Sequence, residues 1–289
     1  MLFLLKIAAF LIGHIPLKVS SFLSGIIGPI IYRLDRKHRN IALDNLGLAF
    51  GDRLGRGRKE EIAAKVFTNL VMTFFEFMRI PWLKRKDLGG YVEFDGIEKI
   101  EKALERKKGL ILITGHFGNW ELLAASLGLS GFSIDIIARD LDNPSFEEFV
   151  RWTRTRPGNR VVSKNRSMRR LLKSLSQNRI AGILIDQNVA LSEGVFADFF
   201  GTPACTNRGP ALLASASSSP VIPIFIVRQG KAHRVLVGDE IGLVNTGDRE
   251  LDAAENTSRF TKAVEEVVRA HPEQWFWVHR RWKTRPPKE

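Results

Sequence analysis

Residues 109–128 read GLILITGHFGNWELLAASLG, and this stretch determines what kind of fold the chain adopts. It begins with a short apolar run rich in isoleucine and leucine, which is typical of a buried strand. A turn with two glycines follows, and the segment after Asn119 has the composition of a helix with that asparagine as its N-cap. The stretch therefore predicts a strand–turn–helix unit, with His116 at the carboxyl end of the strand and Glu121 in the first turn of the helix.

Three further runs have the character of buried strands, at residues 134–138, 180–185 and 221–227. They alternate with helical stretches, of which the clearest covers residues 58–80. Alternation of this kind predicts an α/β fold in which helices flank one central sheet. Ligands of such sheets bind beyond the carboxyl ends of the strands, which is where His116 is expected to lie.

The spacing of His116 and Glu121 suits acyl transfer. A hydroxyl is a poor nucleophile at neutral pH, and a neutral imidazole can take its proton as the oxygen attacks a thioester carbonyl. A carboxylate on the other ring nitrogen fixes the tautomer and stabilises the imidazolium, and we assign this role to Glu121. We also expect the glycines and the N–H groups of the helix start to help bind the oxyanion. The alternative is a chance pairing, because the helix dipole by itself favours a glutamate in the first turn.

The first 32 residues are apolar and predict a membrane anchor. Two lysines, a histidine and a proline interrupt them, so each uncharged run is shorter than the ~20 residues that a spanning helix needs. The whole segment is long enough to span; it could instead lie in the membrane interface or form a buried helical hairpin. If it spans, the basic cluster at 33–39 places the rest of the chain in the cytoplasm. We therefore divide the chain into an N-terminal anchor, residues 1–35, and a single α/β domain, residues 36–289.

The net charge of +13 is concentrated in a few segments. Residues 151–173 contain nine Lys and Arg and no Asp or Glu, and further basic clusters lie within residues 1–40 and 278–289. Local basicity predicts acidic partners, such as anionic lipid, phosphate, an acidic carrier protein or nucleic acid. The single cysteine, Cys205, excludes an intramolecular disulfide and a cysteine-based zinc site. Nothing around it suggests the lowered pKa of a thiol nucleophile.

GHFGNWE, at residues 115–121, resembles the H-x-x-x-x-D/E block of glycerolipid acyltransferases. More narrowly, it is similar to the H-x-G-N-W-E block of the lipid A biosynthesis lauroyl/myristoyl acyltransferase family. Other segments resemble further blocks of that family in the same order, so the resemblance covers nearly the whole chain. These segments are residues 39–50, IDQN at 185–188, FFG at 199–201, TNRGPALLA at 206–214 and PEQWFWVHRRWK at 272–283.

The resemblance implies an acyltransferase with a mixed central sheet flanked by helices, in which His116 and Glu121 are the catalytic pair. No cofactor or metal is expected. Related enzymes also depend on an arginine and an acid further along the chain, for which Arg154 and Asp186 are the candidates. Arg154 would hold a phosphate of the acceptor or of the donor's phosphopantetheine arm.

Gln187 and Arg139 join Asp186 as candidates for a supporting role. Asp186 follows the strand-like run 180–185 and should project at the same sheet edge as His116, as a second partner for the imidazole. Gln187 is the adjacent polar residue, and Arg139 follows the run at 134–138 and could reach the edge of the site. The alternatives are that Asp186 caps the following turn and that the arginines are solvated.

The resemblance also implies the partners. The donor would be a fatty acyl thioester of acyl carrier protein or of CoA, and the acceptor a lipid A precursor or another glycolipid such as a phosphatidylinositol mannoside. Residues 151–173 would attract an acidic carrier, and the terminal basic clusters would bind an anionic membrane surface. Trp275, Trp277 and Trp282 form either an interfacial belt or part of the core.

These implications place the enzyme at the bacterial inner membrane with its catalytic domain on the cytoplasmic side. No nucleic-acid partner is expected. Three other classes compete with this interpretation: a nucleic-acid or membrane-surface binding protein, a thioesterase in which water replaces the acceptor, and a structural membrane protein without activity.

Overall fold

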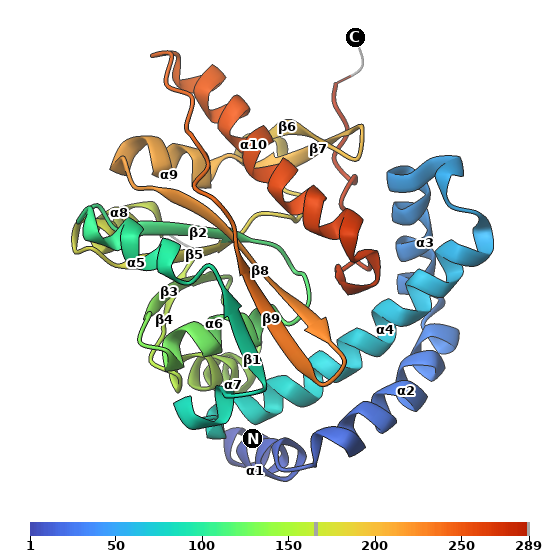
Figure 1. Cartoon of the computed structure of the whole chain (residues 1–289). Helices are drawn as coiled ribbons and strands as arrows, with labels where there is room; N and C mark the ends of the chain where they lie inside the picture. Colours follow the sequence, from blue (N-terminus) through green and yellow to red (C-terminus); the bar gives the residue numbers. More distant parts are fainter. Residues whose placement is uncertain (165–166, 288–289) are drawn as a thin grey trace.

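A computed structural model describes residues 1–164 and 167–287, and seven strands of this part of the chain form one sheet (Figure 1). The strands are β1 (Val92–Asp95), β2 (Leu110–Thr114), β3 (Ile134–Ala138), β4 (Arg160–Ser163), β5 (Ile180–Leu184), β8 (Val221–Gln229) and β9 (Ala232–Val237). Their order is β1-β9-β8-β2-β5-β3-β4, and only β8 and β9 pair in antiparallel fashion within this described sheet. The expected α/β fold with a mixed central sheet is confirmed.

Helices cover both faces of the sheet because β2 is apolar on both sides. Successive side chains of a strand point to opposite faces. Leu110 and Leu112 therefore enter one core, and Ile111 and Ile113 enter the other. The first core is closed by α5 (Glu98–Glu105) and α6 (Trp120–Leu129), with α7 (Pro144–Thr155) beside α6; the second is closed by α8 (Ser167–Ser176), α9 (Gly209–Ser217) and α10 (Arg249–Ala270).

The N-terminal part of the chain is helical and consists of α1 (Leu2–Gly13), α2 (Leu17–Leu34), α3 (Arg36–Phe50) and α4 (Arg56–Arg79). Figure 1 shows α1 and α2 lying along α4, which crosses beneath the sheet. The small residues Ser20, Ser24 and Gly28 recur every four positions and face α4. The approach is close, because a Cβ at Gly28 would lie 2.5 Å from the Cα of Thr68.

The large apolar side chains of α1 and α2 point away from the protein. Phe22 of α2 has 68% of its surface exposed, and Ile26, Ile30 and Phe3 are exposed as well. This arrangement reverses the usual one, in which a surface helix turns its apolar side toward the core. Among the described helices, α2 alone is long and apolar enough to cross a membrane, by length and composition, and only 17% of its window is buried.

The four expected strands and the long helix are present as β2, β3, β5, β8 and α4. The sequence did not predict β1, β4 and β9, nor the antiparallel hairpin of β6 (Gly194–Phe199) and β7 (Thr202–Asn207). Short 3-10 turns complete the described elements, at Gly51–Arg53, Ile80–Trp82, Arg85–Leu88, Leu191–Glu193 and Pro272–Gln274.

Candidate active site

A cavity of about 970 Å³ lies at the carboxyl ends of β2 and β5. Its polar lining contains five of the six residues that the sequence proposed for the site: His116, Glu121, Arg139, Arg154 and Gln187. The sixth residue, Asp186, is buried directly behind His116. The topology accounts for this gathering, since the carboxyl ends of neighbouring parallel strands meet at one edge of the sheet.

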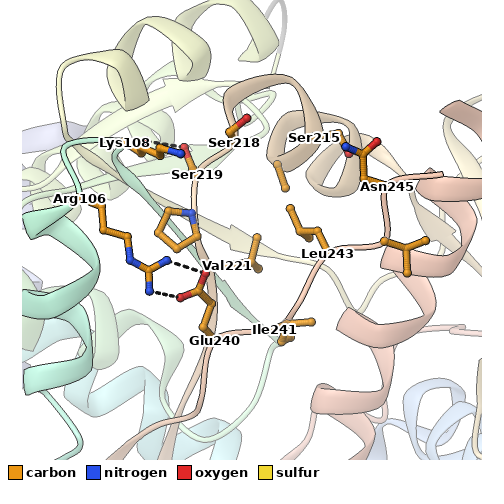
Figure 2. A pocket seen from close by; sticks show the side chains of 13 residues that line it. Arg106, Lys108, Ser215, Ser218, Ser219, Val221, Glu240, Ile241, Leu243 and Asn245 are labelled. Carbon is orange, nitrogen blue, oxygen red and sulfur yellow. Dashed lines mark hydrogen bonds and ion pairs between the residues drawn. The ribbon is translucent and has the colours of Figure 1, made fainter. Parts of the chain in front are cut away.

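A second cavity, of about 300 Å³, lies at the other end of the sheet, where β8 begins (Figure 2). Figure 2 shows Arg106 and Glu240 facing each other on its wall, and their charges neutralise one another in an ion pair of 2.6 Å. The cavity at the carboxyl ends of the strands is therefore the candidate active site.

Asp186 fixes His116 at two points. The ring Nδ1 lies 2.8 Å from Oδ1 of Asp186, and the backbone N–H of His116 donates to Oδ2 at 2.7 Å. The indole N–H of Trp275 donates to the same Oδ2 at 2.7 Å. Full burial opposes ionisation of the carboxyl, but the hydrogen bonds and charge of His116, with the Trp275 bond, hold the pKa of Asp186 below its usual value.

This pairing determines which ring nitrogen can act as a base. An ionised Asp186 only accepts hydrogen bonds, so Nδ1 of His116 carries the proton. Nε2 is then free to accept, and the side-chain amide nitrogen of Gln187 lies 3.3 Å from it. The imidazole is 22% exposed and lines the cavity. Nε2 thus presents a lone pair to whatever occupies the cavity.

The carboxylate on the imidazole is Asp186, whereas the sequence had assigned that place to Glu121. Glu121 instead accepts two hydrogen bonds from Arg154, at 2.6 and 2.9 Å. The register explains the difference: Thr114 of β2 pairs with Leu184 of β5, so the residues two positions further on lie side by side. Glu121 is already inside the first turn of α6 and reaches α7. Burial of Arg154 tends to lower the pKa of its guanidinium, but the charge and hydrogen bonds of Glu121 outweigh this effect and raise that pKa.

Arg139 lies at the rim of the cavity. This position agrees with the alternative interpretation that its side chain is solvated. Its side chain is 84% exposed and lies 3.9 Å from Asp142. It lines the mouth of the cavity without taking part in the ion pair of Glu121 and Arg154. An exposed pair of this kind contributes little to stability.

Two backbone amides of the turn that carries His116 have acceptors within the protein and are not available to an oxyanion, whereas the expectation for the first N–H groups of α6 stays a prediction. The N–H of Phe117 donates to Gly115 and that of Gly118 to the carbonyl of Gln274. The glycines serve close packing instead. Gly118 has a φ of +57°, and a Cβ there would lie 1.9 Å from the carbonyl oxygen of Ile226.

A buried ion pair supports the turn from below. Arg228 of β8 binds both carboxylate oxygens of Glu76, one of them at 2.8 Å. The amide of Asn119, which caps α6, donates to Glu76 at 2.7 Å. Glu76, a lone acid in the apolar stretch of α4, is thus fully paired. Nearby His233 lies 3.3 Å from Glu76, and burial lowers its pKa to about 4.

The sequence missed the contribution of the C-terminal segment. Trp275 holds Asp186, and the N–H of Phe276 donates to the carbonyl of His116 at 3.0 Å. Arg281 is fully buried and donates to the carbonyls of Gln187 and Cys205. Burial lowers its pKa to about 10. The only sign of this contribution in the sequence was the high tryptophan content of PEQWFWVHRRWK. Its three tryptophans are all buried, so they form part of the core and no interfacial belt.

Cys205 lies inside β7 and is fully buried. Burial raises the pKa of its thiol, which is the opposite of what a cysteine nucleophile requires. The sequence likewise showed no sign that Cys205 is a nucleophile.

The comparisons with known proteins identify the family. A family model of bacterial lipid A biosynthesis acyltransferases matches residues 1–284. The chain belongs to that family. It is therefore an acyltransferase of the late lipid A type, as the resemblance of its motifs implied.

Relatives within this lipid A acyltransferase family are named for different acyl chains. The lipid A biosynthesis lauroyltransferase of Escherichia coli (strain K12) is 27% identical over 282 residues, which cover 96% of this chain and 89% of that protein. The myristoyltransferase of the same organism is 25% identical, over 91% of this chain and 80% of that protein. The palmitoleoyltransferase is 24% identical, over 96% and 89%. Identities this similar do not select an acyl chain.

Proposed function

We propose that the protein transfers a fatty acyl group from a thioester donor to a hydroxyl of a lipid A precursor, with His116 as the general base. The observation that carries this proposal is the Asp186–His116 pair, whose unprotonated Nε2 lies at the wall of a cavity with both polar and apolar sides. The hydroxyl acceptor is itself the nucleophile, so the reaction needs no covalent enzyme intermediate.

The proton passes through one nitrogen in both directions. Nε2 of His116 takes the proton of the acceptor hydroxyl as its oxygen attacks the thioester carbonyl carbon. The C–O bond forms, the carbonyl oxygen becomes an oxyanion, and the negative Asp186 stabilises the imidazolium. When the C–S bond breaks, the imidazolium returns the proton to the leaving thiolate. The side-chain amide of Gln187 marks the position that the acceptor hydroxyl would take.

Glu121 and Arg154 form the polar wall beside this base. Their two parallel hydrogen bonds fix both side chains at the start of α6, where they line the same cavity as His116. In the proposal Glu121 completes the catalytic pair by placing negative charge near the imidazolium and orienting the acceptor. Arg154 holds Glu121 and offers its remaining N–H groups to a phosphate of either substrate.

The rest of the cavity is suited to a hydrocarbon chain. Below the polar mouth its wall is made by apolar side chains of α6 and of the sheet, among them Leu123, Leu127, Leu112 and Ile136. An acyl chain bound there would place its thioester carbon beside His116. Each buried methylene contributes ~0.8 kcal/mol.

The basic segment 151–173 supports an acidic donor such as acyl carrier protein, with acyl-CoA as the other form of thioester. Its described part includes the end of α7, which supplies Arg154 to the site, and most of α8, which borders the same cavity. Residues 165 and 166 of this segment, and 288 and 289 of the C-terminal basic cluster, lie outside the described residues. A positive surface beside the entrance would speed the encounter with a negative carrier.

The outward-facing apolar side chains of α1 and α2 support membrane association. Residues 1–35 would then form the anchor, and residues 36–289 the catalytic domain on the cytoplasmic side of a bacterial inner membrane. Lys6, Lys18 and Arg33 accompany these apolar side chains and would bind anionic headgroups.

Acyl transfer in membranes tests the proposal. Labelled acyl carrier protein and a tetra-acylated lipid A precursor are incubated with the wild type and with His116→Ala. We expect a labelled penta-acyl product with the wild type and a loss of ~10³-fold or more in the variant. Donor consumption without product would indicate a thioesterase or another acceptor, such as a phosphatidylinositol mannoside. Equal activity of the variant would refute the role of His116.

A further inference from the structure

The floor of the apolar cavity contains a glycine, Gly182 of β5, between larger apolar residues. The strands β2, β5 and β3 run parallel, and Gly182 of β5 pairs with Leu112 on one side and with Ile136 on the other. All three residues line the cavity, so they form one row across its floor. Leucine and isoleucine fill the two ends of this row, and the glycine leaves its centre open.

The space beside Gly182 is bounded by Ile134. A Cβ at this position would have one neighbour within 4 Å, the Cγ2 atom of Ile134 at 2.7 Å. Its φ lies outside the left-handed region, so the backbone does not require a glycine there. Gly182 is also half-buried although β5 is an interior strand of the sheet. A side chain at position 182 would clash with Ile134, so the glycine makes room for Ile134 at the floor of the cavity.

Ile134 closes the cavity one row further from His116. It pairs with Ile180 of β5, which in turn pairs with Leu110 of β2. Of these three residues only Ile134 lines the cavity among the described residues. Leu110 lies four residues before Thr114, so at ~3.3 Å per residue the floor is ~13 Å long from the row of Thr114 to Ile134.

We propose that Gly182 and Ile134 together set the length of acyl chain that the enzyme accepts. Gly182 adds no side chain to the middle row of the floor, and Ile134, whose Cγ2 atom lies beside Gly182, ends the cavity. This inference rests on the proposed function, since it assigns the apolar part of the same cavity to the acyl group. It also accounts for a family whose relatives are named for different acyl chains.

The test compares rates for a series of saturated acyl thioesters of increasing length, with the lipid A precursor as acceptor. Ile134→Ala should lengthen the preferred chain by about two carbons, and Gly182→Val should shorten it by at least two. Each methylene that loses its apolar wall lowers the relative rate about fourfold. The ratio between a chain and one two carbons longer should therefore change by about 15-fold, in opposite directions in the two variants.

Ile180→Ala is the matched control. Ile180 is as buried as Ile134 and pairs with it, but it does not line the cavity. The control should lose similar stability and keep the length profile of the wild type. Superimposable profiles in Ile134→Ala and the wild type would overturn the inference while leaving acyl transfer intact.

Thermal stabilisation by free fatty acids of increasing length gives a second measurement that needs no transfer. The length of greatest stabilisation should shift in the same directions as the rates. If the wild type transfers no acyl group but this binding series shifts, the proposed function fails and the length limit stands. If neither series shifts in either variant, the length limit fails.

Discussion

Asp186→Asn separates the two carboxylates that could serve His116. The amide keeps the shape of Asp186 but offers an acceptor on one side only. The carboxylate now accepts from Nδ1 on one oxygen, and from the His116 backbone and Trp275 on the other. If the NH₂ group faces Nδ1, the imidazole must carry its proton on Nε2, and no base remains. If it faces the other way, two buried donors lose their acceptor.

The magnitude follows from these two cases. An imidazole in the wrong tautomer costs ~10⁴ in turnover in comparable triads, or ~5 kcal/mol of transition-state stabilisation. The second case costs ~1–3 kcal/mol of folding stability for each unsatisfied donor. We therefore expect the initial rate of acyl transfer to fall by ~10³–10⁴ at saturating substrates, with a measurable drop in the free energy of unfolding.

Glu121→Gln is the control for this experiment. Glu121 lines the same cavity but is paired with Arg154, so its variant should lose less activity than Asp186→Asn. Initial rates and denaturant unfolding are measured for both variants side by side. An Asp186→Asn rate within tenfold of the wild type would refute the reasoning. If only Glu121→Gln loses most of its transfer activity, Glu121 rather than Asp186 is the carboxylate partner of His116, as the sequence suggested.

Three further changes test other parts of the structure. Arg154→Lys keeps the charge but loses the two parallel bonds to Glu121, so denaturant unfolding should show a loss of ~1–2 kcal/mol and transfer should fall at least tenfold; an unchanged rate would exclude a role for the pair. His233 has a folded pKa of about 4, below its unfolded value, so the unfolded chain binds the extra proton and stability is lost as pH falls from ~6.5 toward 4. At ~1.4 kcal/mol per pH unit, His233→Asn should lose ~2 kcal/mol less than the wild type between pH 6.5 and 5, measured by unfolding at both values, and parallel curves would contradict this. Phe22→Ser removes a large exposed apolar side chain and should weaken sedimentation with anionic vesicles by ~10-fold or more, whereas Leu251→Ser, on α10, should not; equal effects would argue against an oriented membrane face.

The core strands were predictable because they are apolar runs, and the histidine turn was predictable because two glycines and a capping asparagine follow β2. β9 was not, since His233 interrupts its apolar pattern, and its buried ring lies beside Glu76 on α4. A contact between residues 157 positions apart leaves no local periodicity.

The carboxylate of His116 was unpredictable for a related reason. Both Glu121 and Asp186 were candidates, and local spacing favoured the nearer one. The choice depends on the register of β2 against β5, which the sequence of neither strand specifies alone. The contribution of Trp275 depends in addition on where the end of the chain returns.

The turn that carries His116 is completed by residues 272–283, which are synthesised long after the turn itself. Gln274 accepts the N–H of Gly118, Phe276 donates to His116 and Trp275 binds Asp186, so residues 272–283 act as a clasp on the histidine. Chains emerge from the ribosome N-terminus first, and α1 and α2 are therefore available to a membrane before this clasp exists. The helices proposed to bind the membrane are thus formed before the proposed base is held in place, so delivery to a bilayer would precede chemistry.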